Sequence, residues 1–183
     1  MPSNSSSTAL VGAIAAGFAA GLAANVGRKA LVQGITAAHG SWDEGLKAEH
    51  RLTMKIFDAI EQTSPDQIRK RGILLTQLAH ALSKHAFEEE NIVYPAMRQH
   101  GQIEAADELV HDHGYVKQNL FDLAEMDKGD PAWIEKVRKF RAEIEQHVAR
   151  EEDELFPALR EALGDKGNAH VTAMMNKAGF AAA

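Results

Sequence analysis

A stretch of fourteen residues occurs twice in this chain, and it constrains the fold more than any other feature. The first copy runs from His85 to Arg98 as HAFEEENIVYPAMR, and the second runs from His147 to Arg160 as HVAREEDELFPALR. In each copy a glutamate follows the histidine by four positions, and an aromatic residue and a proline come later. Residues i and i+4 lie one above the other on one face of an α-helix. Each copy therefore places an imidazole beside a carboxylate, which suggests a metal site.

The rest of the chain is patterned as long amphipathic helices. From residue 41 to residue 163 apolar residues recur at helical spacing, and no alternating run of β-branched residues occurs in the sequence. Helix-start residues divide this region into four segments that begin at Ser41, Ser64, about Gln102 and Asp130. Four long helices joined by short connections fold most simply as an antiparallel up-down-up-down bundle. The predicted fold class is therefore all-α, a four-helix bundle.

Local signals predict where these helices begin and end. Ser41 with Glu44 three positions later is a capping-box pattern, and Ser64 followed by a proline is a second helix start. Pro95 should kink or end the second helix, and Pro157 should bend the fourth, because proline cannot donate an interior helical hydrogen bond.

The two halves of the predicted bundle repeat each other. His50 precedes His113 by 63 residues, and His85 precedes His147 by 62 residues. Each half therefore contributes one helix with a single inward histidine and one helix with a His–Glu pair. Two helix pairs related by a pseudo-twofold axis would place two equivalent half-sites face to face, which suits a site for two metal ions.

Six residues on the inward faces of the four helices form the candidate metal site. They are His50, His85, Glu89, His113, His147 and Glu151. A buried carboxylate is costly unless it is paired or bound to a cation, and imidazole with carboxylate suits iron, manganese or zinc rather than copper(I). If the two carboxylates bridge, each metal receives four protein donors, which leaves positions for an oxo bridge and a small exogenous ligand. A bundle in which the histidines are ordinary core residues is the alternative.

The remaining acidic and aromatic residues of the repeated stretch are given simpler roles. Five acidic residues are expected on a solvated face: Glu88, Glu90, Glu152, Asp153 and Glu154. Among them Glu152 is the one rival ligand, because it lies five positions after His147. Tyr94 and Phe156 are expected to pack beside the site.

Charge and composition exclude several classes of function. The net charge is -6 and no basic run occurs, so nucleic acid is not an expected partner. The sequence has no cysteine, which excludes disulfides, thiolate metal sites and cysteine catalysis. The zinc-protease pattern HExxH, a glycine-rich phosphate loop and a nucleophile elbow are also absent from the sequence.

The two ends of the chain differ from the predicted bundle. Residues 1–40 form an apolar extension rich in Ala and Gly, expected as an extra helix, and residues 9–24 carry no charge. This helix could pack on the bundle or on a second copy, associate with a membrane, or act as a secretory signal. We expect a cytoplasmic protein, with membrane association through this segment as the alternative. Residues 164–183 are expected to be a loose tail with a short helix near residues 171–177.

The ordered set of motifs resembles the hemerythrin family, specifically its bacterial HHE cation-binding branch. The resemblance covers about residues 41–163 and rests on the six candidate ligands together with the Tyr-Pro and Phe-Pro pairs that follow the two glutamates. It implies a hemerythrin-like four-helix bundle that holds a non-haem di-iron centre, two iron ions with an oxo or hydroxo bridge. In that centre Glu89 and Glu151 are the bridging carboxylates.

The chain departs from the oxygen-carrying hemerythrins near His113. Those proteins have a second histidine one turn away on the third helix, where this chain has Leu109 and Lys117. A site with one fewer histidine is more open, which favours reaction with hydrogen peroxide or nitric oxide over reversible oxygen storage. The expected function is therefore a di-iron protein that binds or senses dioxygen, peroxide or nitric oxide. The alternatives are a peroxide-decomposing enzyme with weak peroxidase or catalase-like activity, and an iron storage or buffering module.

Overall fold

The computed structural model describes residues 40–182, and this part of the chain is built from helices, with no strand among the described residues. In chain order the elements are α2 (Trp42–Glu61), α3 (Ile68–Glu88), η1 (Glu89–Val93), α4 (Tyr94–Gln99), α5 (Ile103–Glu125), α6 (Pro131–Arg150), η2 (Glu151–Leu155) and α7 (Phe156–Ala182). The elements η1 and η2 are π-helical turns. The predicted all-α fold class is confirmed.

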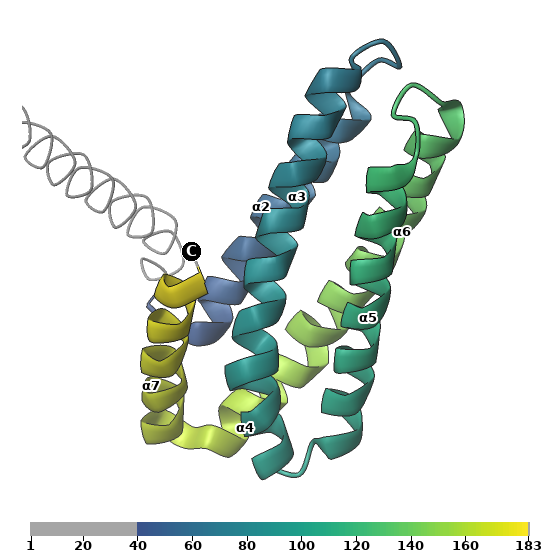
Figure 1. Ribbon diagram of the computed structural model, residues 1–183. Helices are drawn as coiled ribbons and strands as arrows, with labels where there is room; N and C mark the ends of the chain where they lie inside the picture. The colour runs from purple at the N-terminus through teal and green to yellow at the C-terminus, as the bar shows by residue number, and fades with distance from the viewer. Residues whose placement is uncertain (1–39, 183) are drawn as a thin grey trace, which may run out of the picture.

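The four long helices α2, α3, α5 and α6 lie side by side and alternate in direction (Figure 1). Contacts connect α2 with α3, α3 with α5, α5 with α6, and α6 with α2, so the helices close into a ring. The predicted four-helix bundle is therefore confirmed. The expected N-terminal helix, including residues 9–24, lies outside the described residues. Within residues 40–182 no helix has the length and apolarity that a membrane span requires.

The bundle core is divided into two apolar clusters along its length. The first contains Trp42, Leu46, Val93, Tyr94, Ala96, Met97, Ala106, Leu109, Phe156, Leu159, Val171 and Met175. The second contains Phe57, Ile60, Leu75, Leu78, Leu82, Leu123, Trp133, Val137, Phe140 and Ile144. The candidate ligands belong to neither cluster, and in sequence they fall between the residues of the two on every long helix. A buried polar layer thus separates two apolar layers.

Three of the four predicted helix starts agree with the structure, because Ser41, Gln102 and Asp130 stand directly before α2, α5 and α6. The Asp130 side chain accepts a hydrogen bond from the Ala132 amide at 2.7 Å, as expected for the cap of α6. Ser41 precedes α2, but its side chain makes no capping hydrogen bond, so the predicted capping box is not formed. Ser64 does not start α3. It opens a turn in which the Ser64 amide donates to the Gln67 side chain at 3.1 Å, and the helix begins after that turn.

The prolines of the repeated stretch do not end their helices. In η1 the Tyr94 amide donates to the Glu89 carbonyl, five residues back, just before Pro95. The Phe156 amide makes the matching bond to the Glu151 carbonyl in η2. A π turn shifts the hydrogen-bond ladder by one residue, so a proline without an N–H can follow while the chain stays helical. Of the two outcomes expected at Pro95, an end of the helix is not observed, because α4 follows η1 without a break.

The C-terminal residues are helical rather than a loose tail. The chain kinks at Gly164, whose φ of 59° suits glycine, and α7 then continues to Ala182. Val171 and Met175 are buried in the first apolar cluster. The Trp42 indole donates to the Asn168 side chain at 2.8 Å, and this bond joins the last helix to the start of α2. The short helix expected near residues 171–177 is therefore one part of the longer helix α7.

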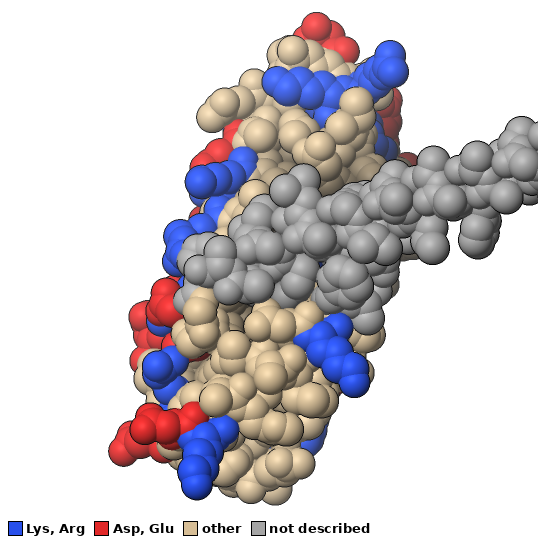
Figure 2. Space-filling model, turned by 90° about the vertical axis from the view of Figure 1, so that its left-hand side faces the viewer, with Lys and Arg blue, Asp and Glu red and all other residues tan. Residues whose placement is uncertain are grey.

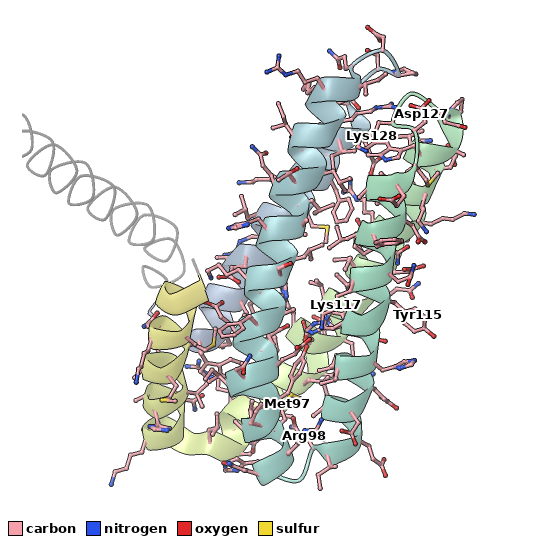
Figure 3. The ribbon with its side chains drawn as sticks, in the orientation of Figure 1. Met97, Arg98, Tyr115, Lys117, Asp127 and Lys128 are labelled. Carbon is pink, nitrogen blue, oxygen red and sulfur yellow. The ribbon has the colours of Figure 1, made fainter. Side chains whose placement is uncertain are left out.

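A buried arginine joins the two loops at the end of the bundle away from α7. Arg71 donates to the Thr63 hydroxyl at 2.8 Å and to the Thr63 carbonyl at 3.2 Å. It also donates to the carbonyl of Lys128, which Figure 3 labels in the α5–α6 loop. Its guanidinium lies over the Trp133 ring, 5.1 Å from the ring centroid. Arg71 therefore connects the two halves of the bundle through backbone groups.

We expect Arg71→Leu to lower the free energy of unfolding by about 2–3 kcal/mol, because it leaves buried hydrogen-bonding groups without a donor. Urea denaturation followed by circular dichroism measures this loss. Arg69→Leu, at an exposed position two residues away, is the matched control and should change stability by less than about 0.5 kcal/mol. Equal losses in the two variants would contradict the role given to Arg71.

Candidate metal centre

All six candidate ligands converge at the middle of the bundle. Their potential ligand atoms form two groups, each with atoms within 4.8 Å of one another. One group contains His50, His85, Glu89 and Glu151, and the other contains Glu89, His113 and His147. Each long helix supplies one histidine, and each glutamate is the first residue of a π turn. The two copies of the repeated stretch therefore meet at one centre.

Each glutamate lies between imidazoles of the two halves. Glu89 Oε2 is 3.1 Å from His85 Nε2 and 3.4 Å from His113 Nε2. The Glu151 carboxylate lies 3.4 Å from both His147 Nε2 and His50 Nε2, through its two oxygens. Both carboxylates are fully buried. This is the placement that a carboxylate shared between two cations requires.

Several buried polar atoms of the centre have no hydrogen-bond partner in the described part of the protein. They are Glu89 Oε1, Glu151 Oε2 and His147 Nε2. Two further ring nitrogens, His50 Nε2 and His85 Nε2, face each other at 3.0 Å. Buried polar atoms are nearly always paired, because an unpaired one loses its hydration without compensation. Cations bound between these nitrogens and oxygens would supply the missing partners, so the residues present fit a metal centre.

A second set of carboxylates holds the outer nitrogen of every imidazole. Glu152 lies 2.7 Å from His50 Nδ1, and Glu90 lies 3.0 Å from His113 Nδ1. Glu49 lies 3.1 Å from His85 Nδ1, and Asp112 lies 3.3 Å from His147 Nδ1. When an imidazole binds a metal, a carboxylate at Nδ1 keeps the proton there and directs the Nε2 lone pair toward the cation. All four Nε2 atoms are thereby oriented for metal binding.

These outer carboxylates were missed by the sequence analysis. Glu90 and Glu152 contact ligand imidazoles instead of forming only a solvated face, and Glu152 is not grouped with the inner atoms as a rival ligand. Glu88 is also fully buried, where it accepts a hydrogen bond from Lys84 at 2.8 Å. Asp153 and Glu154 are exposed, as expected. The internal repeat contained the signal for these four residues. Each outer carboxylate stands directly before a single inward histidine or directly after one of the two inner glutamates.

Tyr94 reaches the centre rather than packing beside it. Its hydroxyl lies 3.1 Å from Glu89 Oε2, 3.0 Å from Glu151 Oε1 and 3.2 Å from His113 Nε2. Burial and the two carboxylates raise the pKa of Tyr94 well above its usual value, which keeps the phenol protonated. The second copy has Phe156 at the matched position, where it stacks on the His50 ring at 6.2 Å. The hydroxyl therefore makes the two half-sites different.

The pKa values of the centre show how its charge is balanced without metal. Burial disfavours the charged form of His85, but Glu89 and Glu49 raise its pKa well above the usual value. Burial likewise opposes the charge on His147, but Glu151 and other nearby carboxylates raise its pKa to about 9. Burial alone would raise the pKa of Glu89, but His85 and His113 lower it well below the usual range. Protons on His85 and His147 thus take the electrostatic role that a cation would have.

A small cavity lies directly against the four imidazoles. Its volume is about 20 Å³, and its other walls are mostly apolar, including Leu82, Val116, Ile144 and Val148. A cavity of about 10–15 Å³ or more can hold one water molecule. The centre is therefore accompanied by space for a ligand of very few atoms.

The fold and the centre together define an all-helical bundle with a buried His/Glu site suited to cations. A family model described as the hemerythrin HHE cation binding domain matches residues 43–159. The chain belongs to this family, and the resemblance stated from the motifs is confirmed. The description of the family names cation binding.

Two curated proteins are similar to parts of the chain. A protein of Nostoc sp. named DNA nickase is 24% identical over 138 residues, which cover 75% of this chain and 38% of that protein. A hemerythrin-like protein of Schizosaccharomyces pombe is 24% identical over 105 residues, which cover 55% of this chain and 51% of that protein. The chain thus spans about half or less of the relatives it matches. No solved structure matches it.

The raised histidine pKa values predict how the metal-free protein responds to pH. A raised folded-state pKa contributes stability that is fully present below the unfolded value of about 6.5. That stability is lost as pH rises through the folded value, which is about 9 for His147. We therefore expect the melting temperature of metal-free protein to fall between pH 6.5 and 9, and His147→Ala to flatten this fall. A fall of the same size in His147→Ala would show that other groups cause it.

Tyr94→Phe should weaken metal retention without removing a candidate ligand. The phenol fixes the orientation of the two glutamates, and losing a partner of this kind typically costs about 10-fold in metal affinity. Competition with a chelator, monitored by metal analysis, measures the change. Tyr115→Phe, which alters an exposed tyrosine, should leave retention unchanged. Unaltered retention in Tyr94→Phe would mean that the hydroxyl does not organise the carboxylates.

Proposed function

We propose that this chain is a non-haem di-iron protein that binds or senses dioxygen or a related small molecule, namely hydrogen peroxide or nitric oxide. The observation that carries the proposal is the position of Glu89 and Glu151, each between imidazoles of both halves of the bundle. Four imidazoles with two shared carboxylates suit borderline cations such as iron. Membership in a cation-binding family supports a metal, and the cavity beside the imidazoles supports a ligand of a few atoms.

The six inner residues would hold two iron ions with an oxo or hydroxo bridge. Bound iron would supply reversible ligand binding or redox chemistry, while the chain positions and shields the centre. Glu49, Asp112, Glu90 and Glu152 keep the imidazoles oriented through their Nδ1 atoms. The apolar cavity walls limit the access of bulk water.

A peroxide-decomposing activity is the second candidate, and Tyr94 is the observation that favours it. Its hydroxyl is a proton donor at hydrogen-bonding distance from both glutamates and His113. Peroxide cleavage requires a proton at the departing oxygen, and a positioned phenol can provide it. Iron storage is less well supported, because inner residues that are mostly buried beside a small cavity do not suit rapid exchange of iron.

Nothing in the described residues favours extending the nickase name to this chain. Its net charge is -6. On the part of the face in Figure 2 that grey atoms leave visible, basic and acidic side chains are interspersed. Binding to a phosphate backbone usually requires a continuous basic patch. Membrane or self-association through residues 9–24 stays a prediction, as does a cytoplasmic location.

Metal analysis of protein produced in iron-supplemented medium tests the proposal. We expect about two iron ions per chain, as in other di-iron bundles with histidine and carboxylate ligands, together with the ultraviolet absorption of an oxo-bridged pair. His113→Ala should lose iron and this absorption. His111→Ala, at an exposed position on the same helix, should keep both.

Addition of hydrogen peroxide separates the two candidates. A sensor should change its spectrum once, in proportion to the protein present, whereas an enzyme should consume many equivalents. Zinc alone, or equal iron content in His113→Ala and the parent, would contradict the di-iron proposal.

A further inference from the structure

A groove between α5 and α6 leads from the surface toward the metal centre. Its volume is about 570 Å³, and its polar walls include Asn119 and Glu143. Val116, Ile144 and His147 also border it. The same three residues line the 20 Å³ cavity beside the four imidazoles. The side chains of Val116 and Ile144 therefore form a shared wall between the groove and the inner cavity.

The direction of side chains on α5 agrees with this arrangement. Lys117 reaches across to Glu90, at 3.1 Å, on the side that faces η1. Tyr115 leaves the helix on the opposite side, away from α3, and it lines the groove (Figure 3). The α5–α6 side of the bundle is thus distinct from the α3–α5 side, where Glu90 and Lys117 lie.

The internal repeat supplies a comparison with the other half of the bundle. The 62- and 63-residue steps pair Val116 with Thr53 and Ile144 with Leu82. Thr53 and Leu82 are buried, as Ile144 is, and both line the inner cavity. Neither of them borders the groove. Equivalent positions therefore face the same cavity from two sides, and the groove runs along one of those sides.

The outer carboxylates of the two halves differ in exposure. The Asp112 side chain, which holds His147, is 44% exposed. The Glu49 side chain, which holds His85, is 11% exposed, and Lys84 binds it there together with the buried Glu88. The α2–α3 half is closed by a buried network of charged groups, whereas the α5–α6 half opens to solvent.

We propose that small uncharged ligands enter the centre through the α5–α6 groove, and that Val116 and Ile144 control their passage by size. The proposal rests on the proposed function, because it concerns the ligand of that same centre. Apolar walls disfavour ions, which would lose their hydration. The inner cavity admits only a molecule of a few atoms, and small side-chain rotations at Val116 and Ile144 suffice to connect it with the groove.

The test uses the iron-loaded full chain and nitric oxide as the probe, with binding followed by stopped-flow absorption. Ile144→Ala opens the shared wall, and Leu82→Ala removes a side chain of equal size from the paired position on the closed side. We expect nitric oxide association and dissociation to quicken together by about 5-fold in Ile144→Ala, because a gate changes both rates and leaves the affinity unaltered. Leu82→Ala should stay within about twofold of the parent in both rates.

Val116→Phe enlarges a partly exposed side chain of the shared wall and should narrow the passage. This variant tests the proposal even if Ile144→Ala does not fold. It should slow association and dissociation together, with iron content and spectrum as in the parent. If Ile144→Ala and Leu82→Ala accelerate nitric oxide association and dissociation equally, the proposal of an α5–α6 entrance is wrong. Unchanged rates in Val116→Phe would also contradict it. If the parent protein binds iron but neither nitric oxide, dioxygen nor peroxide, the proposed function is contradicted. The proposal of an entrance for such ligands is then contradicted as well.

Discussion

Two buried glutamates are the constraint on which the rest of this structure depends. Glu89 and Glu151 are fully buried, and each lies against two imidazoles. An isolated buried carboxylate would destabilise the folded protein by several kcal/mol. Without metal, protonated histidines with raised pKa values supply the compensating charge. With metal, cations would take that place, so folding and metal binding depend on the same polar layer.

The bundle is organised to hold this layer rigidly. Apolar clusters lie on both sides of it along the helices, and they keep water from the carboxylates. The π turns begin at the two glutamates and let the helices continue past Pro95 and Pro157, so that the aromatic residues before those prolines come back onto the centre. The two copies of the repeated stretch differ at this aromatic position, since one supplies the Tyr94 hydroxyl and the other the Phe156 ring. A duplicated architecture thus gives a centre with two unequal halves, one of them open to the α5–α6 groove.

The sequence predicted the parts of this arrangement that depend on periodicity. Helical spacing was sufficient to place His50, His113 and Glu89 on inward faces, because those faces are fixed by the apolar residues around them. Helical spacing gave wrong predictions where tertiary contacts or an uncommon backbone conformation decide the local structure. The buried bonds of Arg71 accompany a later start of α3 than Ser64 indicated, and a π turn cannot be recognised from a proline alone. Glu90 resembled a solvated residue because its partner, His113, is distant in sequence. Whether the six inner residues bind metal stays a prediction.

Anomalous X-ray diffraction at the iron absorption edge, from crystals of the iron-loaded full chain, tests the central claim most directly. We predict two iron peaks in the polar layer. One should lie against His50 and His85 and the other against His113 and His147, with Glu89 and Glu151 touching both. A single peak, a peak outside the layer, or no iron while the four imidazoles stay bonded to the glutamates would contradict the claim that these carboxylates are buried in order to be shared by two metal ions.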